Sequence, residues 1–205
     1  MMFVPQNAKR RRAVLSVFAV MAAVTVAACT MNVPERPRPQ FAYTQYPPTV
    51  LNVAEINVVE AYAPPMRLPN VEHLMPEPLT QSVATWARNR FRAGGADGVV
   101  TITVSDASVT AKDLSRTQGV KGWFTVDQAE RFDARVLVEM QVDGVALGST
   151  GSGTVRVERG QTVAENASVQ DRDRVWTRMS ESILLDLDAG TQQMLQNRLP
   201  FLLQN

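Results

Sequence analysis

The chain has 205 residues, and its 21 basic and 20 acidic side chains leave a formal net charge of +1 at pH 7. This balance excludes the strongly basic composition that is typical of general nucleic-acid binding. One histidine and one cysteine are too few for a metal site built from those residue types. The length suits a single domain whose core is large enough to fold without disulfides.

The first 28 residues have the layout of an export signal. A basic cluster at 9–12 precedes an apolar run at 13–28, which only Ser16 and Thr25 interrupt. This order is typical of a secretory signal, and the apolar run is shorter than the roughly 20 residues of a membrane span. Removing the signal leaves 17 basic against 20 acidic side chains, a net charge near −3. We therefore expect no nucleic-acid partner.

The single cysteine, Cys29, directly follows Val26, Ala27 and Ala28. This stretch resembles a bacterial lipobox, which implies that cleavage occurs between Ala28 and Cys29 and that the sulfur carries a lipid. The alternative is ordinary signal cleavage beside an incidental thiol. A free thiol is a redox liability in an exported protein, which favours acylation. The resemblance to Gram-negative lipoproteins, with Thr30 after the cysteine, implies a lipid anchor on the periplasmic face of the outer membrane.

Prolines 34, 37, 39, 47 and 48 mark the segment that follows the cysteine. Proline fixes φ and lacks an N–H, so this segment favours an extended spacer over a packed element. The predicted organisation is a signal peptide at 1–28, an acylated cysteine with a proline-rich tether at 29–50, and an α+β periplasmic domain at 51–205.

Alternating apolar residues at 54–59 predict the first strand of the domain. A proline-rich loop follows at 61–78, and apolar residues at helical spacing then predict a helix of about fifteen residues from Leu79 to the glycines at 94 and 95. Residues 100–105 alternate again and predict a second strand. Residues 106–128 show no sustained period.

The clearest strand pattern is the alternation over 132–142, which ends at Asp143 and Gly144. This dipeptide is a signal for a two-residue type I′ hairpin. Such a turn places Val142 opposite Val145 and makes 145–158 the next strand. Ser149, Gly151 and Gly153 lie on the apolar face of that strand, where small residues either leave room for a close helix or mark a bulge.

The last predicted element is a long helix that ends before Pro200. Ser168 and Asp171 resemble a capping box at its start. Its apolar stripe consists of Trp176, Met179, Ile183, Leu187, Gly190 and Met194. The predicted order β-α-β-β-β-α is an α+β fold: a single, mostly antiparallel four-stranded sheet with two helices packed on one face.

No combination of residues in the sequence predicts catalysis or a cofactor. His73 is the only histidine and lies in a proline-rich loop, and no nucleophile elbow or phosphate-binding loop is present. Asp186 and Asp188 are two apart on a helix and point to different sides. Asp171 and Asp173 suit the positive end of a helix dipole. We therefore expect neither an enzyme nor a metal protein.

Arg88, Arg90 and Arg92 gather at the end of the first helix. Cations at a helix C-terminus complement the helix dipole, so a purely structural role is one interpretation. The other is a site for an anion or a lipid phosphate.

Lys121, Trp123 and Phe124 lie in a stretch for which no element is predicted. Adjacent large aromatic residues in a loop either fold back over the core or bind a partner. These three residues are the candidates for partner binding.

The lipobox, the proline tether and the order of elements resemble small envelope lipoproteins of Gram-negative bacteria. The layout is similar to the LPS-assembly lipoprotein family and to auxiliary lipoproteins of ABC-type transport systems. The stretches at 69–74 and 121–132 are similar to alphaproteobacterial outer-membrane lipoproteins.

This resemblance implies a non-enzymatic accessory subunit in outer-membrane assembly or lipid transport, with a protein partner in the envelope. The alternative is a carrier that holds a lipid or small ligand between sheet and helices, and a tight core favours the first over the second. An enzyme acting on envelope polymers would need a cleft with a perturbed carboxylate pair.

Overall fold

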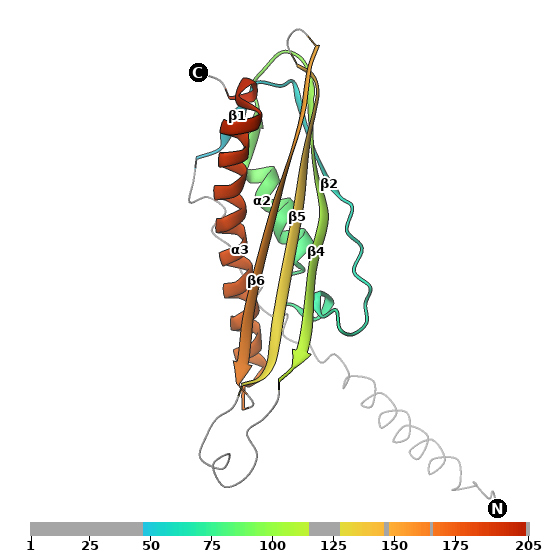
Figure 1. Ribbon diagram of the computed structural model, residues 1–205, viewed down its shortest axis with the longest axis vertical. Coiled ribbons are helices and arrows are strands. Elements are labelled where there is room, and N and C mark those ends of the chain that lie inside the picture. Colours follow the sequence, from blue (N-terminus) through green and yellow to red (C-terminus); the bar gives the residue numbers. More distant parts are fainter. Residues whose placement is uncertain (1–46, 115–127, 146–147, 165, 204–205) are drawn as a thin grey trace, which may run out of the picture. The chain divides into compact units, whose positions relative to one another are not determined.

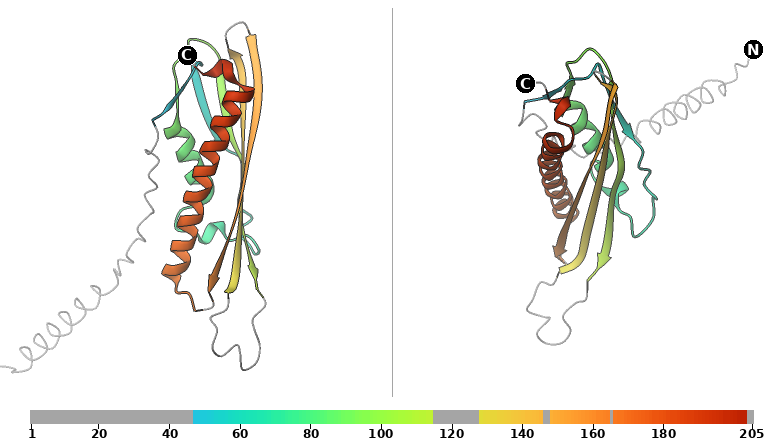
Figure 2. Two further views of the ribbon diagram at one scale, coloured as in Figure 1. Left: turned by 60° about the vertical axis from the view of Figure 1, so that its left-hand side comes forward. Right: turned by 45° about the horizontal axis from the view of Figure 1, so that its top comes forward.

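The computed structural model describes residues 47–114, 128–145, 148–164 and 166–203. A four-stranded sheet forms one layer of this domain, and two long helices cover one face of the sheet (Figure 1, Figure 2). The sheet has the order β2-β4-β5-β6, with β2 at Glu55–Glu60, β4 at Val99–Asp113, β5 at Gln128–Val145 and β6 at Ser149–Ala164. The β2–β4 pair is parallel and the other two pairs are antiparallel. The predicted α+β fold is confirmed.

Strand β4 is longer than the sequence pattern predicts. Val100, Ile102 and Val104 are buried, and the next buried apolar residues are Ala107 and Val109. The pairing with β5 shifts between Val104 and Asp106, so the buried positions change from even to odd numbers. A bulge of this kind adds one residue to a strand and breaks a period of two. The alternation is therefore lost from the sequence although the strand continues to Asp113.

The predicted two-residue turn at Asp143 and Gly144 is wrong. Strand β5 continues to Val145, and Val142 pairs with Gly151 rather than with Val145. Gly144 has φ +70°, which belongs to an irregularity of the ladder between Val142 and Val145. The same left-handed backbone that favours glycine in a tight turn also occurs at a bulge.

The corrected register is offset from the predicted one by six residues. An even offset leaves each side chain on its predicted face, because the period of a strand is two. Val155 and Val157 are accordingly buried, whereas Thr154, Arg156 and Glu158 are exposed.

Helix α2 spans Leu79–Arg90, and the chain then turns directly into the short strand β3, Phe91–Ala93. The predicted helix is therefore three residues too long. Phe91 is still buried, and its ring meets the Trp86 ring edge-on at a centroid distance of 5.6 Å. β3 pairs in parallel with β1, Thr49–Leu51, which also bridges to Leu203 near the end of the chain.

Helix α3 spans Val169–Arg198 and begins with the predicted capping box. Asp171 N–H donates to the Ser168 hydroxyl at 3.2 Å, and Ser168 N–H donates to the Asp171 carboxylate at 3.0 Å. The large apolar residues of the predicted stripe are buried: Trp176, Met179, Ile183, Leu187 and Met194. None of the helices in the described ranges is long and apolar enough to cross a membrane.

Helix α3 lies close to β6 because glycines face it. A Cβ atom at Gly151 would meet the Leu199 side chain at 2.6 Å, and one at Gly153 would collide with Met194. From the helix side, a Cβ at Gly190 would lie 2.8 Å from Val155. The predicted role of the small residues on β6 is confirmed, because side chains of α3 and of the residues after it occupy the space that a Cβ at these glycines would need.

The segment between β2 and α2 stands off the β2 side of the sheet (Figure 1). β2 stops pairing with β4 at Glu60, which lies opposite Val104. Further along β4, Val71 N–H donates to Val109 C=O and Ala111 N–H donates to Pro69 C=O, both at 2.8 Å. The segment is therefore attached to β4 at its start and again at residues 69–71, and the residues between these two attachments project from the sheet.

Candidate functional site

Arg90, one of the three predicted anion-binding arginines, lies inside the protein. Its Nε donates to Asp188 Oδ1 at 2.6 Å, and its Nη1 donates to Pro47 C=O at 2.5 Å and to Thr49 Oγ1 at 2.7 Å. Trp86 Nε1 donates to the same Asp188 oxygen at 3.3 Å. The pair joins α2, α3 and the start of the domain, and this placement corrects the anion-site hypothesis for Arg90.

Arg88 and Arg92 remain at the surface and do not converge with Arg90. Arg88 forms an exposed ion pair with Glu60 at 2.8 Å. Arg92 Nη1 donates to the carbonyl oxygens of Arg88 and Phe91, at the end of α2. These contacts satisfy helix-terminal carbonyls, as basic residues commonly do at a C-terminus. The three arginines therefore do not form one site.

Ala28, Cys29, Lys121, Trp123 and Phe124 lie outside the described residues. The predictions of signal cleavage and acylation at residues 28 and 29 stay predictions. The same holds for partner binding by Lys121 and the two aromatic residues.

Three acidic residues of α3, Asp171, Asp186 and Asp188, are engaged in structural contacts. Hydrogen bonds from the Ser168 side chain and backbone, and then the Arg174 guanidinium, hold the pKa of Asp171 below its usual range. Asp186 pairs with Arg159 of β6, and Asp188 pairs with the interior Arg90. Within the described residues, no group of three or more potential metal ligands comes together.

A buried carboxylate that the sequence pattern does not predict lies in the segment before α2. Glu72 is 1% exposed and accepts hydrogen bonds from Tyr62 Oη at 2.7 Å, Asn70 Nδ2 at 3.2 Å and Val109 N–H at 3.2 Å. Burial, followed by the hydrogen bond to Glu72 and its negative charge, raises the pKa of Tyr62 above its usual value. Tyr62 therefore remains a neutral donor. The cluster holds both ends of the projecting segment together.

The sequence feature that could have indicated this cluster is Glu72, which lies between the apolar residues Val71 and Leu74 in Asn70-Val71-Glu72-His73-Leu74. A carboxylate is rarely fully buried without partners. Its burial depends on Tyr62 and Val109, which the fold brings to it from ten residues before and 37 residues after.

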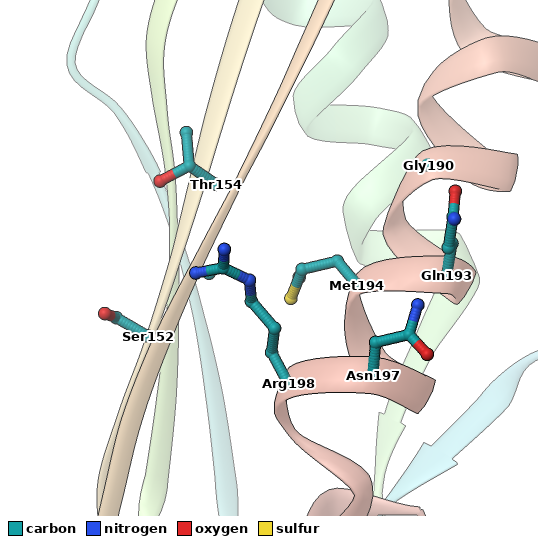
Figure 3. A pocket seen from close by; sticks show the side chains of 8 residues that line it. Ser152, Thr154, Gly190, Gln193, Met194, Asn197 and Arg198 are labelled. Atoms are coloured by element: carbon teal, nitrogen blue, oxygen red, sulfur yellow. The ribbon is translucent and has the colours of Figure 1, made fainter.

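An open groove lies between β6 and the last turns of α3 (Figure 3). The groove has a volume of about 370 Å³ and is lined by Ser152, Gly153 and Thr154 of the strand and by Gly190, Gln193, Met194, Asn197 and Arg198 of the helix. Figure 3 shows Arg198 extending from the helix towards the strand. Within the described part of the chain, no carboxylate pairs with Arg198.

The chemistry of this groove is that of polar binding. Its hydroxyl, amide and guanidinium groups can accept or donate hydrogen bonds, and the groove contains no acid–base pair. Arg198 also stands in the last turn of α3, where a cation complements the helix dipole. The groove therefore suits a polar ligand or a polar surface, and it does not resemble the apolar cavity of a lipid carrier.

No family model matches this chain, and no curated protein matches it in sequence. Among solved structures, the chain is similar to rare lipoprotein B from Shewanella oneidensis, with 13% identity, a TM-score of 0.38, and 69% of this chain and 94% of the other covered. It is also similar to a minor lipoprotein from Acinetobacter baumannii, with 10% identity, a TM-score of 0.36, and 70% and 92% covered. Likenesses at this level do not assign a function to the chain.

Proposed function

We propose that the protein is a lipid-anchored, non-enzymatic lipoprotein of the bacterial cell envelope. It serves as an accessory subunit of outer-membrane assembly or lipid transport. The observation that carries this proposal is the single cysteine directly after Val26, Ala27 and Ala28, at the end of an apolar export signal. At this position acylation consumes the thiol and supplies an anchor.

The tight seam between α3 and β6 favours the accessory subunit over the carrier. Glycines bring the helix within contact of the strand, and the side chains of Val155, Met194 and Leu199 along the seam are buried. A carrier needs a cavity between sheet and helices that can hold most of its ligand. The described groove is instead polar and lies at the surface.

Replacing Cys29 by alanine is expected to abolish lipid attachment and to leave an unprocessed or unanchored chain. The reason is chemical, because alanine has no sulfur to carry the diacylglycerol group. Metabolic labelling with a fatty-acid analogue, followed by membrane fractionation, measures both effects. Thr30→Ala is the matched control and should label like the parent chain. A Cys29→Ala chain that still labels and still fractionates with the outer membrane would show that the lipobox assignment is wrong.

Trp123 and Phe124 are the proposed contacts to the envelope partner. Each side chain has enough apolar area to anchor a protein interface. We expect the double variant Trp123→Ala with Phe124→Ala to lose crosslinks to an envelope protein in intact cells while its urea midpoint hardly moves. The control is Lys121→Ala, which removes charge and leaves both rings. If the double variant instead loses several kcal/mol of stability, the rings belong to the core and the partner site lies elsewhere.

A further inference from the structure

The tip of the segment between β2 and α2, residues 64–69, exposes two large apolar side chains. Met66 is 65% exposed and Leu68 is 77% exposed. The segment projects from the β2 side of the sheet in Figure 1 and in the right-hand view of Figure 2. Exposed apolar side chains that stand together on a projection mark an interaction surface more often than scattered ones do.

Hydrogen bonds at the base of the tip fix its backbone conformation. Below it, Tyr62 and Asn70 both donate to the buried Glu72, and Asn70 N–H also donates to Arg67 C=O at 2.9 Å. Met66 has φ +57°, a left-handed conformation that non-glycine residues rarely adopt. Backbone outliers of this kind concentrate at sites where function requires a fixed geometry.

The composition of the tip matches the surface of an anionic bilayer. Arg67 stands between the two apolar side chains, and residues 61–71 contain no aspartate or glutamate. Apolar side chains enter the acyl boundary while a guanidinium stays with the lipid phosphates. Pro64, Pro65 and Pro69 have no N–H, so half of the six tip residues bring no backbone donor into a medium where it would go unsatisfied.

A bilayer lies within reach of the tip if Cys29 is acylated. The 18 residues from 29 to 46 can span at most about 60 Å. The longest element of the domain is strand β5, which with 18 residues is about 60 Å long. The fully extended tether can therefore be about as long as this strand, and it allows the projecting segment to meet the membrane that holds the anchor.

From these observations we infer that residues 64–69 form a second membrane contact, in which Met66 and Leu68 enter an anionic bilayer and Arg67 binds lipid phosphate. The contact orients the domain on the membrane. The inference rests on the proposed anchor only for bringing the domain to a bilayer.

Depth-dependent fluorescence quenching tests this contact on the full chain. Met66→Cys and Leu68→Cys are each labelled with an environment-sensitive dye, and the protein is reconstituted into vesicles of phosphatidylglycerol and phosphatidylcholine brominated on its acyl chains. Leu185→Cys is the matched control. Leu185 is another exposed apolar residue, 50% exposed, on the helix that packs against β6 at the opposite edge of the sheet. The parent chain, with Cys29 as its only cysteine, is the labelling blank.

We expect strong quenching at positions 66 and 68 and little at 185. With the dye at 66, Leu68→Ser should lower the ratio of docked to free loop about tenfold, because a leucine no longer enters the bilayer. Arg67→Gln should remove the dependence on phosphatidylglycerol, whereas Arg92→Gln, on another element, should not.

Three results would overturn the inference. A chain that pellets with the vesicles but shows no quenching at 66 and 68 leaves the anchor in place and rejects the second contact. Dyes that lipid does not quench, and that are also shielded from iodide, assign the tip to a protein surface instead. A chain that stays in the supernatant rejects both the anchor and the contact.

Discussion

Replacing Asp188 by alanine is expected to lower the free energy of unfolding by about 3–5 kcal/mol, because it leaves the Arg90 guanidinium buried without its counter-charge. The side chains of Arg90 and Asp188 are 9% and 11% exposed. Trp86 Nε1 would lose its acceptor as well. Equilibrium urea denaturation measures the loss.

Asp186→Ala is the matched control for this experiment. Asp186 has the same charge on the same helix, but its partner Arg159 is 47% exposed and Asp186 itself is 36% exposed. Pairs of this kind contribute about 0–1 kcal/mol. Equal small losses for the two variants would mean that the interior pair does not join the helices as the structure shows.

A double variant that removes both charges of the Arg90–Asp188 pair is the second test of this pair. Combining Arg90→Met with Asp188→Leu removes both charges and is expected to recover part of the loss, since apolar replacements of buried pairs are often neutral or stabilising. The recovery should be incomplete, because Arg90 also donates to Pro47 C=O and Thr49 Oγ1. A full recovery would show that those two contacts contribute little.

Replacing Trp176 by alanine is expected to cost about 3–5 kcal/mol, the usual range for removing a large aromatic side chain from a core. Trp176 is 6% exposed and packs against Phe132 with ring centroids 5.3 Å apart. The side chain therefore fills space between α3 and β5. The shift of the urea midpoint, at unchanged slope, reports the loss.

Trp176→Phe separates the packing of the ring from the chemistry of the indole. The buried Trp176 Nε1 has no hydrogen-bond partner among the described residues. Phenylalanine keeps an aromatic ring and removes this unsatisfied donor, so we expect a loss below about 1.5 kcal/mol. Val169→Ala, at an exposed position of the same helix, should change stability by no more than about 0.5 kcal/mol. A large loss for Trp176→Phe would mean that the space left by the smaller ring, or a partner of the N–H, outweighs the removal of the unsatisfied donor.

Elements whose signals are local could be predicted from the sequence. The sequence predicts the Ser168–Asp171 capping box and the stripe from Trp176 to Met194 correctly, because both depend on spacing within one helix. The faces of β6 were also predicted correctly. These faces are correct although the predicted turn is wrong, because a register offset of six residues preserves a period of two.

The candidate site could be predicted only in part. The sequence predicts the acylated Cys29 and the aromatic pair at 123 and 124 by composition and position alone, and these stay predictions. The spacing of Arg88, Arg90 and Arg92 in the sequence predicts a shared site, but the structure places the three side chains in different surroundings. Side chains two residues apart on a helix do not face one direction, so proximity in sequence did not imply a shared site.

The sequence by itself determined the apolar faces of the strands and the long capped helix, because each depends on residues that are neighbours along the chain. The export signal is a prediction of the same local kind. Only the tertiary structure decided that Arg90 is interior, since its partner Asp188 is 98 residues away. It also decided that Glu72 is buried, through donors from Tyr62 and Val109 on separate segments. The tertiary structure also decided the bulge after Val104 and the continuation of β5 past Gly144. A buried charge is stable only when distant residues supply its counter-charge or its hydrogen bonds. A strand likewise continues through residues that favour a turn only when distant residues supply its hydrogen bonds.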